Sequence, residues 1–383
     1  MKITGVTTYL CGNPWKNWLF VVLETDEGIS GVGEGTLNAL GRTVETAIHE
    51  LEPRFIGLDP FQIETLTQRM TRDVYSEGGQ VHGCAVAAVE MACWDIIGKA
   101  TGQPVHNLLG GRYHEKLRAY ANGWYRGERT PDAFAEGARE VVRRGYTALK
   151  FDPFGVAYRV TDRRDEDLSI AIVEAVRETV GPEIDLMIEG HCRFSVASAV
   201  RIGERLEPFA PAWFEEPTPH QNIDAVVEVA RHLNIPVATG ESFSSVHQFA
   251  ELLARNAVHI LQPEPLNLGG LWNARKVIGM ADAFYGIVAP HNAQGPVATA
   301  ACIQLGAACP NFYVQEVFDE FNVDWERKIV NHPVEVIDGY ITVPERPGLG
   351  IELNLDEIGQ HPYEPHNFLP LFAEGWQRRV GDQ

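Results

Sequence analysis

Paired cysteines are missing from this sequence of 383 residues, whose six cysteines are scattered with no CxxC spacing. Such a distribution is typical of reduced thiols in a cytoplasmic protein and not of a disulfide framework. No run comes near the roughly 20 apolar residues that cross a bilayer. The opening residues, MKITGVTTYL, are too short and too polar for a signal peptide. We therefore expect a cytoplasmic protein with no membrane partner.

Basic charge is also scarce. The chain has 32 Lys and Arg residues against 52 Asp and Glu residues, a formal net charge of −20. Nucleic acids and anionic membranes bind basic patches, so this charge disfavours both as partners. The negative electrostatic potential of such a protein would also repel an acidic substrate. An enzyme acting on an acidic substrate would therefore need a cation in its site.

Several familiar nucleotide-binding and hydrolase motifs are absent as well. The string GVGEGT at 31–36 lacks the third glycine of a dinucleotide-binding fingerprint, and no Walker A, HExxH or GxSxG string occurs. What is present is an ordinary globular composition, with 45% hydrophobic and 22% charged residues. A chain of this length accommodates one large α/β domain and a smaller companion.

Short apolar runs alternate with helical patterns from about residue 118 onward. The runs lie at 118–124, 147–152, 185–191, 212–217, 236–241, 259–264, 286–292 and 312–317. Between them, segments such as 165–180 and 222–233 have the apolar periodicity of helices. Eight strands alternating with helices predict a parallel (β/α) barrel of the TIM type, whose chemistry lies at the carboxyl ends of its strands. An open doubly wound sheet is the competing interpretation.

The first 115 residues follow a different pattern. Strand-like segments at 2–10 and 17–24 precede helical patterns at 42–56, 60–73 and 83–100. We therefore expect an α+β capping domain over residues 1–115. A tail rich in proline and glycine, about 343–383, is expected to return and complete it. The barrel domain would then span 116–342.

Glu189, Glu215 and Glu241 each lie at the end of a predicted strand. Their intervals are equal, 215 − 189 = 26 and 241 − 215 = 26 residues, one strand–helix unit each. Equal units place these carboxylates side by side at the barrel mouth, where they would repel one another unless a cation lay between them. Oxygen ligands without cysteine favour Mg²⁺ over zinc. Glu216 points to the opposite face of its strand, so we expect it to support Glu215 and not to bind the metal.

Other predicted strand ends carry polar residues too. They are Lys150 and Asp152 on the second strand, His191 on the third, Glu264 on the sixth, His291 on the seventh and Glu316 on the eighth. A carboxylate beside an imidazole fixes its tautomer and raises its basicity. Glu264 and His291, on neighbouring strands, are therefore predicted to form an acid–base pair. His191 follows Glu189 by two residues and is expected on the same side of its strand.

Taken together, these strings resemble the enolase superfamily, in its mandelate racemase subgroup of acid-sugar dehydratases. The first region carries AAVEMACWDIIGKATGQPVHNLLGG at 87–111, which is similar to the helix-and-loop signature of that family's capping domain. In the predicted barrel, YANGWY, ALKFDPFG, IEGHCRF, WFEEP, TGES and APHNAQGP are similar to strings of gluconate and arabinonate dehydratases. The resemblance covers nearly the whole chain.

By this resemblance, a Mg²⁺ ion held by Glu189, Glu215 and Glu241 binds the carboxylate of the substrate. Glu316 corresponds to a glutamate that lies near that carboxylate. The second strand departs from the family's Lys-x-Lys pattern because it reads KFD at 150–152. Asp152 therefore stands where a second base would be, and we expect it to contact the substrate.

The implied reaction is dehydration of a sugar acid, a gluconate-like aldonate, to a 2-keto-3-deoxy acid through an enediolate. His291, oriented by Glu264, would abstract the proton α to the carboxylate. Lys150 would stabilise the charge that develops, and His191 would protonate the departing β-hydroxyl. QPE at 262–264 departs from the usual QPD and lengthens the orienting arm by one C–C bond, ~1.5 Å.

Other functions stay open at this point. A racemase or epimerase would form the same intermediate but needs a second base, which KFD lacks. The substrate could instead be an aldarate, arabinonate or galactonate, and cycloisomerisation of a lactone or muconate is a further alternative. A metal-dependent protein that binds sugar acids without turnover would need no acid–base pair.

Two capping loops, 11–18 and 74–79, are expected to set the choice of substrate. Lys16 and Tyr75 are the candidates for contact with the distal hydroxyls. Members of the family are commonly oligomers, so the resemblance also implies a homo-oligomer, with an octamer as one form.

Overall fold

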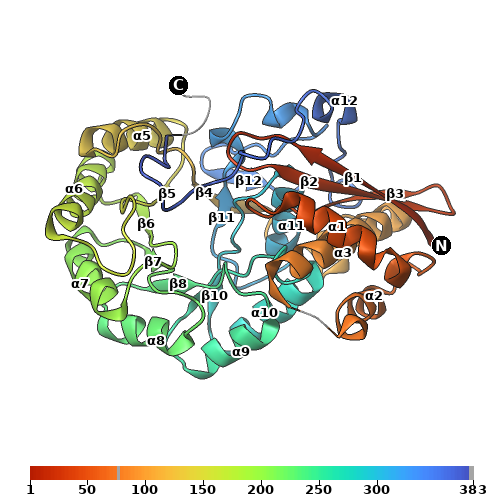
Figure 1. The fold of residues 1–383 in the computed structure, drawn as a ribbon, viewed down its shortest axis with the longest axis horizontal. Helices are drawn as coiled ribbons and strands as arrows, with labels where there is room; N and C mark the ends of the chain where they lie inside the picture. The colour runs from red at the N-terminus through yellow and green to blue at the C-terminus, as the bar shows by residue number, and fades with distance from the viewer. Residues whose placement is uncertain (76–77, 379–383) are drawn as a thin grey trace.

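Eight parallel strands form a closed barrel in the computed structural model, which describes residues 1–75 and 78–378 (Figure 1). They are β4 (Lys116–Ala121), β5 (Ala148–Phe151), β6 (Asp185–Glu189), β7 (Trp213–Glu215), β8 (Val237–Thr239), β9 (Ile260–Leu261), β10 (Ile287–Val288) and β11 (Gln315–Val317). Neighbouring strands pair in the order β10-β9-β8-β7-β6-β5-β4-β11. A parallel bridge from Val288 to Phe312, just before β11, joins the two ends of this sheet. The predicted barrel is therefore confirmed over the open sheet.

Helices cover the outside of the barrel, one after each of the first seven strands (Figure 1). They are α5 (Pro131–Arg143), α6 (Arg163–Val180), α7 (Val196–Leu206), α8 (Ile223–His232), α9 (Val246–Ala254), α10 (Leu271–Ala283) and α11 (Pro296–Ala307), with a 3₁₀ turn, η2 (Glu207–Phe209), after α7. The start of α5 follows local rules, because Thr130 accepts a hydrogen bond from Ala133 N and Pro131 opens the helix. After β11 the described chain continues through 3₁₀ turns η3 (Asp319–Phe321) and η4 (Glu326–Lys328), then β12 (Tyr340–Thr342), antiparallel to β4.

The strands are shorter than the apolar runs that predicted them. The run 286–292, for example, contains a strand of two residues, Ile287–Val288. The first seven runs continue past their strands into the loops at the barrel mouth, whereas the run 312–317 ends with β11. Asp152, His191, Glu241, Glu264 and His291 lie in these loops, whereas Lys150, Glu189, Glu215 and Glu316 lie within the strands themselves.

One apolar or aromatic residue from each strand segment fills the barrel interior. This buried layer consists of Tyr120, Ala148, Met187, Trp213, Ala238, Ile260, Ala289 and Val314. Side chains on a strand alternate between faces, so the residue two positions further along also points inward. A second inward-facing layer therefore lies directly above the first, at the mouth.

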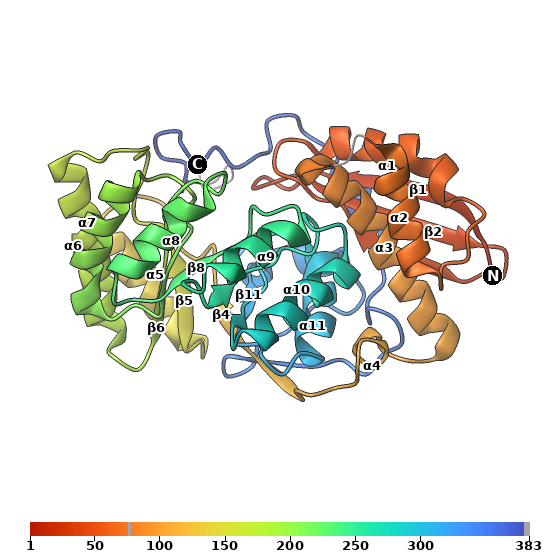
Figure 2. The ribbon, with the colours of Figure 1, turned by 90° about the horizontal axis from the view of Figure 1, so that it is seen from below.

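The capping domain is a three-stranded antiparallel sheet packed on helices (Figures 1 and 2). Its elements are β1 (Ile3–Cys11), β2 (Trp18–Thr25), β3 (Ser30–Glu34), α1 (Gly41–Phe55), α2 (Ile63–Met70), the 3₁₀ turn η1 (Arg72–Val74) and α3 (Gly79–Thr101), followed by the short α4 (Val105–Leu108). Gly31 and Gly33 of the GVGEGT string face α3 so closely that a Cβ would lie 2.1 Å from Ala92 O and 1.9 Å from Ala88 O. These glycines allow the close approach of strand and helix.

Helix α3 is the one helix among the described residues that is long and apolar enough to cross a membrane, and 83% of its apolar window is buried inside the protein. It carries Glu90 and Asp95 at fully buried positions. Both contact other parts of the chain, as described below for Glu90. This burial identifies α3 as a core helix.

The C-terminal segment returns to the capping sheet and then to the barrel (Figure 2). After the short α12 (Leu355–Ile358), Gly12 N donates to His361 O (2.8 Å) and Asn17 Nδ2 donates to Glu364 O (2.7 Å). Further on, Trp376 Nε1 donates to Gly155 O at the barrel mouth (3.1 Å). The limits of the two domains stay a prediction.

Candidate active site

A ring of polar side chains forms the second inward-facing layer, two residues beyond the apolar one. Its members are Asn122, Lys150, Glu189, Glu215, Gln262, His291 and Glu316, with Gly240 at the eighth position. All seven side chains come from strand ends, as the sequence predicted for five of them. The period of two places them on one level at the barrel mouth.

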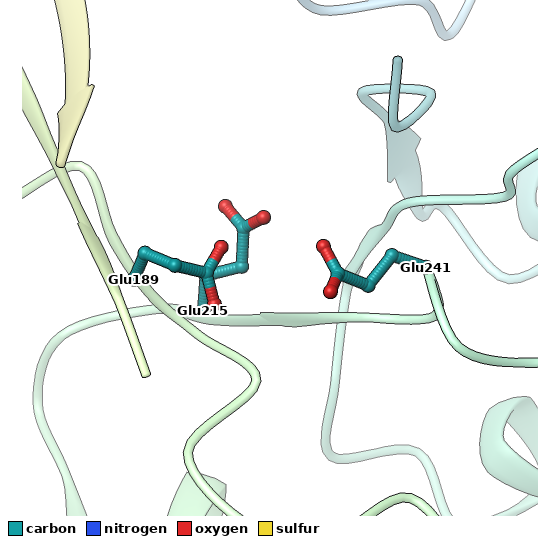
Figure 3. Close-up of side chains that lie close together, drawn as sticks. All are labelled: Glu189, Glu215 and Glu241. Atoms are coloured by element: carbon teal, nitrogen blue, oxygen red, sulfur yellow. The ribbon is translucent and has the colours of Figure 1, made fainter. Parts of the chain in front are cut away.

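Glu189, Glu215 and Glu241 converge from β6, β7 and the loop after β8. Each offers one oxygen, and these oxygens lie within 4.8 Å of one another. Figure 3 shows Glu189 and Glu215 side by side, with Glu241 reaching toward them from across the gap. Burial and mutual repulsion raise the pKa of the Glu189 and Glu215 carboxyls. Glu189 Oε2 is also buried and accepts no hydrogen bond from the described residues, although Lys150 Nζ lies 3.4 Å away. Three converging carboxylates with a free acceptor fit a divalent cation.

Lys150 brings a buried positive charge to the edge of this cluster. Its Nζ lies 2.6 Å from Glu215 Oε1, 2.9 Å from Glu316 Oε1 and 3.4 Å from Glu189 Oε2. Burial alone would lower the pKa of Lys150, but these carboxylates outweigh it and raise the pKa well above the ordinary value. Lys150 therefore stays cationic at neutral pH.

Glu216 faces away from the cluster and anchors the turn before Glu241. Its Oε1 accepts hydrogen bonds from Thr239 Oγ1 (2.9 Å) and Gly240 N (2.7 Å), and its Oε2 accepts from Cys192 Sγ (3.0 Å). These contacts match the supporting role expected for Glu216. They fix the loop that carries Glu241, in addition to any effect on Glu215.

His291 and Glu264 form a dyad between the seventh and sixth strands. His291 Nδ1 lies 2.6 Å from Glu264 Oε2, while Glu264 Oε1 accepts a hydrogen bond from Leu266 N (3.1 Å). The longer glutamate arm is thus held at both oxygens. Burial disfavours the charged imidazole, but Glu241, Glu316 and Glu264 raise the pKa of His291 to about 10. A cation held by Glu241 would oppose that rise.

A second dyad faces the first from the opposite side of the barrel. His191 Nδ1 lies 2.7 Å from Asp152 Oδ2, and the guanidinium of Arg193 contacts the same oxygen. Asp152 Oδ1 accepts from Phe154 N (2.8 Å). Burial raises the pKa of Asp152, but Arg193 and His191 outweigh it and lower this pKa below the ordinary value. Asp152, expected beside the substrate, lies behind His191 as its orienting partner, and a direct contact with the substrate stays a prediction.

The remaining candidates lie around these two dyads. Glu316 is buried and accepts hydrogen bonds from Asn292 N (2.7 Å) and Asn122 Nδ2 (2.8 Å). Lys16 reaches the mouth from the loop between β1 and β2, and its contacts are described below. Tyr75 is 96% exposed and no described residue holds its hydroxyl. Residues 76–77 of the predicted loop 74–79 lie outside the described part of the chain.

A hollow of about 410 Å³ opens beside His191 and Glu241. It is lined by the loop after β5, by His220 and by the C-terminal segment, with Tyr158 and Phe372 among its walls. Trp376 packs edge-on against His191, with ring centroids 6.0 Å apart. The sequence did not predict that the C-terminal segment reaches the His191 side of the mouth.

Asn122 and Gln262 are the members of the ring that the sequence analysis did not single out. Both lie two residues beyond the apolar layer, so strand periodicity applied to all eight strands could have found them. Gln262 is fully buried, and neither atom of its amide has a hydrogen-bond partner among the described residues. A buried, unpaired amide calls for a ligand or a water molecule.

Two family profiles match the chain. "Enolase C-terminal domain-like" matches residues 133–358, and "Mandelate racemase / muconate lactonizing enzyme, N-terminal domain" matches residues 14–110. Among solved structures, a mandelate racemase/muconate lactonizing enzyme from Jannaschia sp. CCS1 has a TM-score of 0.89 at 34% identity, covering 95% of this chain and 98% of that one. The mandelate racemase/muconate lactonizing enzyme-like protein from Roseovarius sp. TM1035 has a TM-score of 0.90 at 34% identity, covering 98% of both chains.

Curated relatives are similar over most of their length. The D-gluconate dehydratase of Thermoproteus tenax is 34% identical over 94% of this chain and 73% of its own. The D-gluconate/D-galactonate dehydratase of Picrophilus torridus is 36% identical over 88% of this chain and 87% of its own. The D-galactonate dehydratase of Pectobacterium atrosepticum is 33% identical over 92% of both. All three are named for dehydration of a sugar acid.

Proposed function

The chain belongs to the mandelate racemase/muconate lactonizing enzyme family of the enolase superfamily, and we propose that it is a Mg²⁺-dependent dehydratase of a sugar acid. It is a carbon–oxygen lyase that converts an aldonate such as D-gluconate or D-galactonate to a 2-keto-3-deoxy acid. One observation carries this function: two histidine–carboxylate dyads, with their histidines in the loops after the third and seventh strands, flank a cluster of three carboxylates.

Glu189, Glu215 and Glu241 would hold the metal ion. When bound, Mg²⁺ supplies the positive charge that attracts an acid to this protein of net charge −20 and stabilises negative charge on the substrate carboxylate. Lys150 adds a fixed cation beside the same position. Glu316 holds Lys150 in place through the 2.9 Å contact between Oε1 and Nζ.

His291 is the base in this proposal. Glu264 binds Nδ1, so Nε2 faces the mouth, 3.3 Å from Glu241 Oε2. A cation held by Glu241 would offset the rise in the pKa of His291 and leave Nε2 with its lone pair. Nε2 takes the proton α to the carboxylate, and the C–H electron pair moves into the enediolate form of the substrate. Lys150 stabilises the charge that develops there.

His191 is the acid. Asp152 Oδ2 accepts a hydrogen bond from Nδ1–H, and Nε2–H donates its proton to the departing β-hydroxyl. The C–O bond breaks, water leaves, and the resulting enol tautomerises to the keto acid. A racemase would instead need Asp152 as a free base, but Asp152 is engaged by His191 and Arg193.

Replacement of the base tests this function. We expect H291N to lose α-proton exchange in D₂O and to lower kcat by about 10²–10⁴-fold, the usual contribution of general acid–base catalysis. Exchange is read by NMR, and keto acid is read with semicarbazide over a panel of aldonates and aldarates. Exchange at the wild-type rate in H291N would contradict the assignment of the base. Wild-type protein that forms no keto acid from any member would contradict the function itself. A cytoplasmic location and a homo-oligomer stay predictions.

A further inference from the structure

The capping domain forms hydrogen bonds with the segment that follows His291 at two points. Lys16, on the loop between β1 and β2, donates from Nζ to Ala293 O (2.9 Å) and to Gln294 Oε1 (3.1 Å). The segment then enters α11, and the second contact lies at the start of that helix. Lys16 therefore reaches across the domains to the backbone two residues from the base.

Glu34, at the end of β3, makes the second contact. Its Oε1 accepts from Gly295 N (2.7 Å) and its Oε2 accepts from Ala298 N (2.8 Å). A carboxylate at this point satisfies two of the free N–H groups that begin α11. Lys16 and Glu34 together fix residues 293–298 from the capping side.

Gln294 connects Lys16 to the catalytic dyad. Its Nε2 donates to Glu264 Oε2 at 3.4 Å, and this is the oxygen that lies 2.6 Å from His291 Nδ1. A lysine ammonium has only donors, so Lys16 dictates that the oxygen of the Gln294 amide faces it. The NH₂ end is then the one that faces Glu264. A flipped amide would place its oxygen against the carboxylate.

Lys16 is itself held firmly. The side chain is 6% exposed, and its flanking residues are tied down on both sides. Asn13 Oδ1 accepts from Trp15 N (2.8 Å), and Asn17 Nδ2 donates to Glu364 O and Asn367 O of the C-terminal segment. Burying an ammonium against a carbonyl and an amide is costly. This cost indicates that the buried position of Lys16 serves a function.

We propose that Lys16 is a positioning residue for the base: it orients Gln294, which completes the hydrogen bonding of Glu264 and so holds His291 in line for proton abstraction. This inference rests on the proposed function for its catalytic meaning. It assigns the capping domain a part in the chemistry itself. Glu264 is one methylene longer than the usual aspartate. The contact from Gln294 Nε2 to Glu264 Oε2 also explains how this longer side chain is held in one place.

The test uses K16M, Q294L and the double variant in the full-length enzyme loaded with Mg²⁺. Misplacement of a reacting group by about 1 Å can cost on the order of 100-fold in rate. We expect kcat on the aldonate to fall by about 10–100-fold in K16M, with KM changed less than about threefold. We expect Q294L to do the same and the double variant to be no slower than the slower single, because both act through one contact.

The matched control is K276M. Lys276 also links the two domains, through a 2.8 Å contact from Nζ to Glu64 Oε2, but this ion pair joins α10 to α2. We expect K276M to keep the wild-type kcat. If K16M fails to fold, Q294L carries the test, and thermal unfolding of each variant identifies that case.

Crystal structures of the substrate-free variants supply a readout that does not depend on turnover. We expect the contact between His291 Nδ1 and Glu264 Oε2 to lengthen or the Gln294 amide to turn in K16M, and neither to change in K276M. An undisturbed dyad with raised KM would overturn the inference and make Lys16 a substrate ligand. A disturbed dyad with unchanged kcat would overturn it too. Wild-type protein inactive on every sugar acid would refute the proposed function, and the structures would still decide what Lys16 positions.

Discussion

Gln262, in the polar ring at the barrel mouth, carries a side-chain amide that none of the described residues pairs. Removing an unsatisfied buried polar group is favourable, whereas removing a satisfied one costs about 1–3 kcal/mol. We therefore expect Q262L to leave unfolding free energy unchanged or raise it, and to lower kcat/KM because a ligand partner is lost. Urea unfolding and initial rates measure the two effects.

Gln304 provides the matched control for that prediction. It is also fully buried, but its Oε1 accepts from His106 N (2.9 Å) and its Nε2 donates to Leu349 O (3.4 Å). Q304L should destabilise the fold by about 1–3 kcal/mol. Equal destabilisation by Q262L and Q304L would mean that the Gln262 amide is satisfied.

Individual residues were predictable from the sequence where one strand period decides them. The 26-residue spacing correctly placed Glu189 beside Glu215, and adjacency on a strand separated Glu215 from Glu216. Glu241 joins the cluster from the loop after β8, one residue past the equivalent position, Gly240. The place of Asp152 was not predictable in this way. It lies beyond the end of β5, where Arg193 and the loop direct it to His191, and strand alternation no longer applies.

At the level of elements, Glu90 links α3 to the start of α10. Its Oε2 accepts from Leu271 N (2.9 Å) and its Oε1 accepts from Trp272 N (2.8 Å). Burial outweighs these hydrogen bonds and raises the pKa of Glu90 to about 7, from 4.5. A proton bound more tightly in the folded state stabilises the fold at low pH, and this contribution is lost as pH rises through about 7.

The E90Q variant isolates that contribution. Between pH 5 and pH 8 the unfolding free energy of the wild type should fall relative to E90Q by about 3 kcal/mol or less. Urea unfolding of both proteins at the two pH values measures the difference, and subtraction removes the titration of all other groups. A difference that stays constant with pH would show that Glu90 is ionised in the fold throughout this range.

Helices and strands were predictable because each repeats its own apolar period, and the barrel and the family are confirmed. The contacts between elements were not. Lys16 and Ala293, or Glu34 and Gly295, lie far apart in the sequence and share no local pattern. Only the packing of β1–β3 against the start of α11 brings them together.

The whole molecule is acidic, with a net charge of −20, and the three clustered carboxylates concentrate further negative charge at one point. Any cation therefore stabilises the fold by general screening, and a bound divalent ion stabilises it additionally through its site. The site contribution amounts to about 2.7 kcal/mol when the free ion is at 100 times its Kd. Measurements at equal ionic strength, with NaCl in place of MgCl₂, separate the two.

Addition of Mg²⁺ should reverse the order of thermal stability of the E241Q variant and the wild type. Without a divalent ion it should unfold at a higher temperature than the wild type, because one of three repelling carboxylates is gone. With Mg²⁺ at matched ionic strength, the wild type should gain several degrees and E241Q little, so that the wild type becomes the more stable. Differential scanning calorimetry in the two salts measures both shifts. An equal Mg²⁺-dependent gain in E241Q would show that the ion acts on the general field and that Glu241 is no ligand.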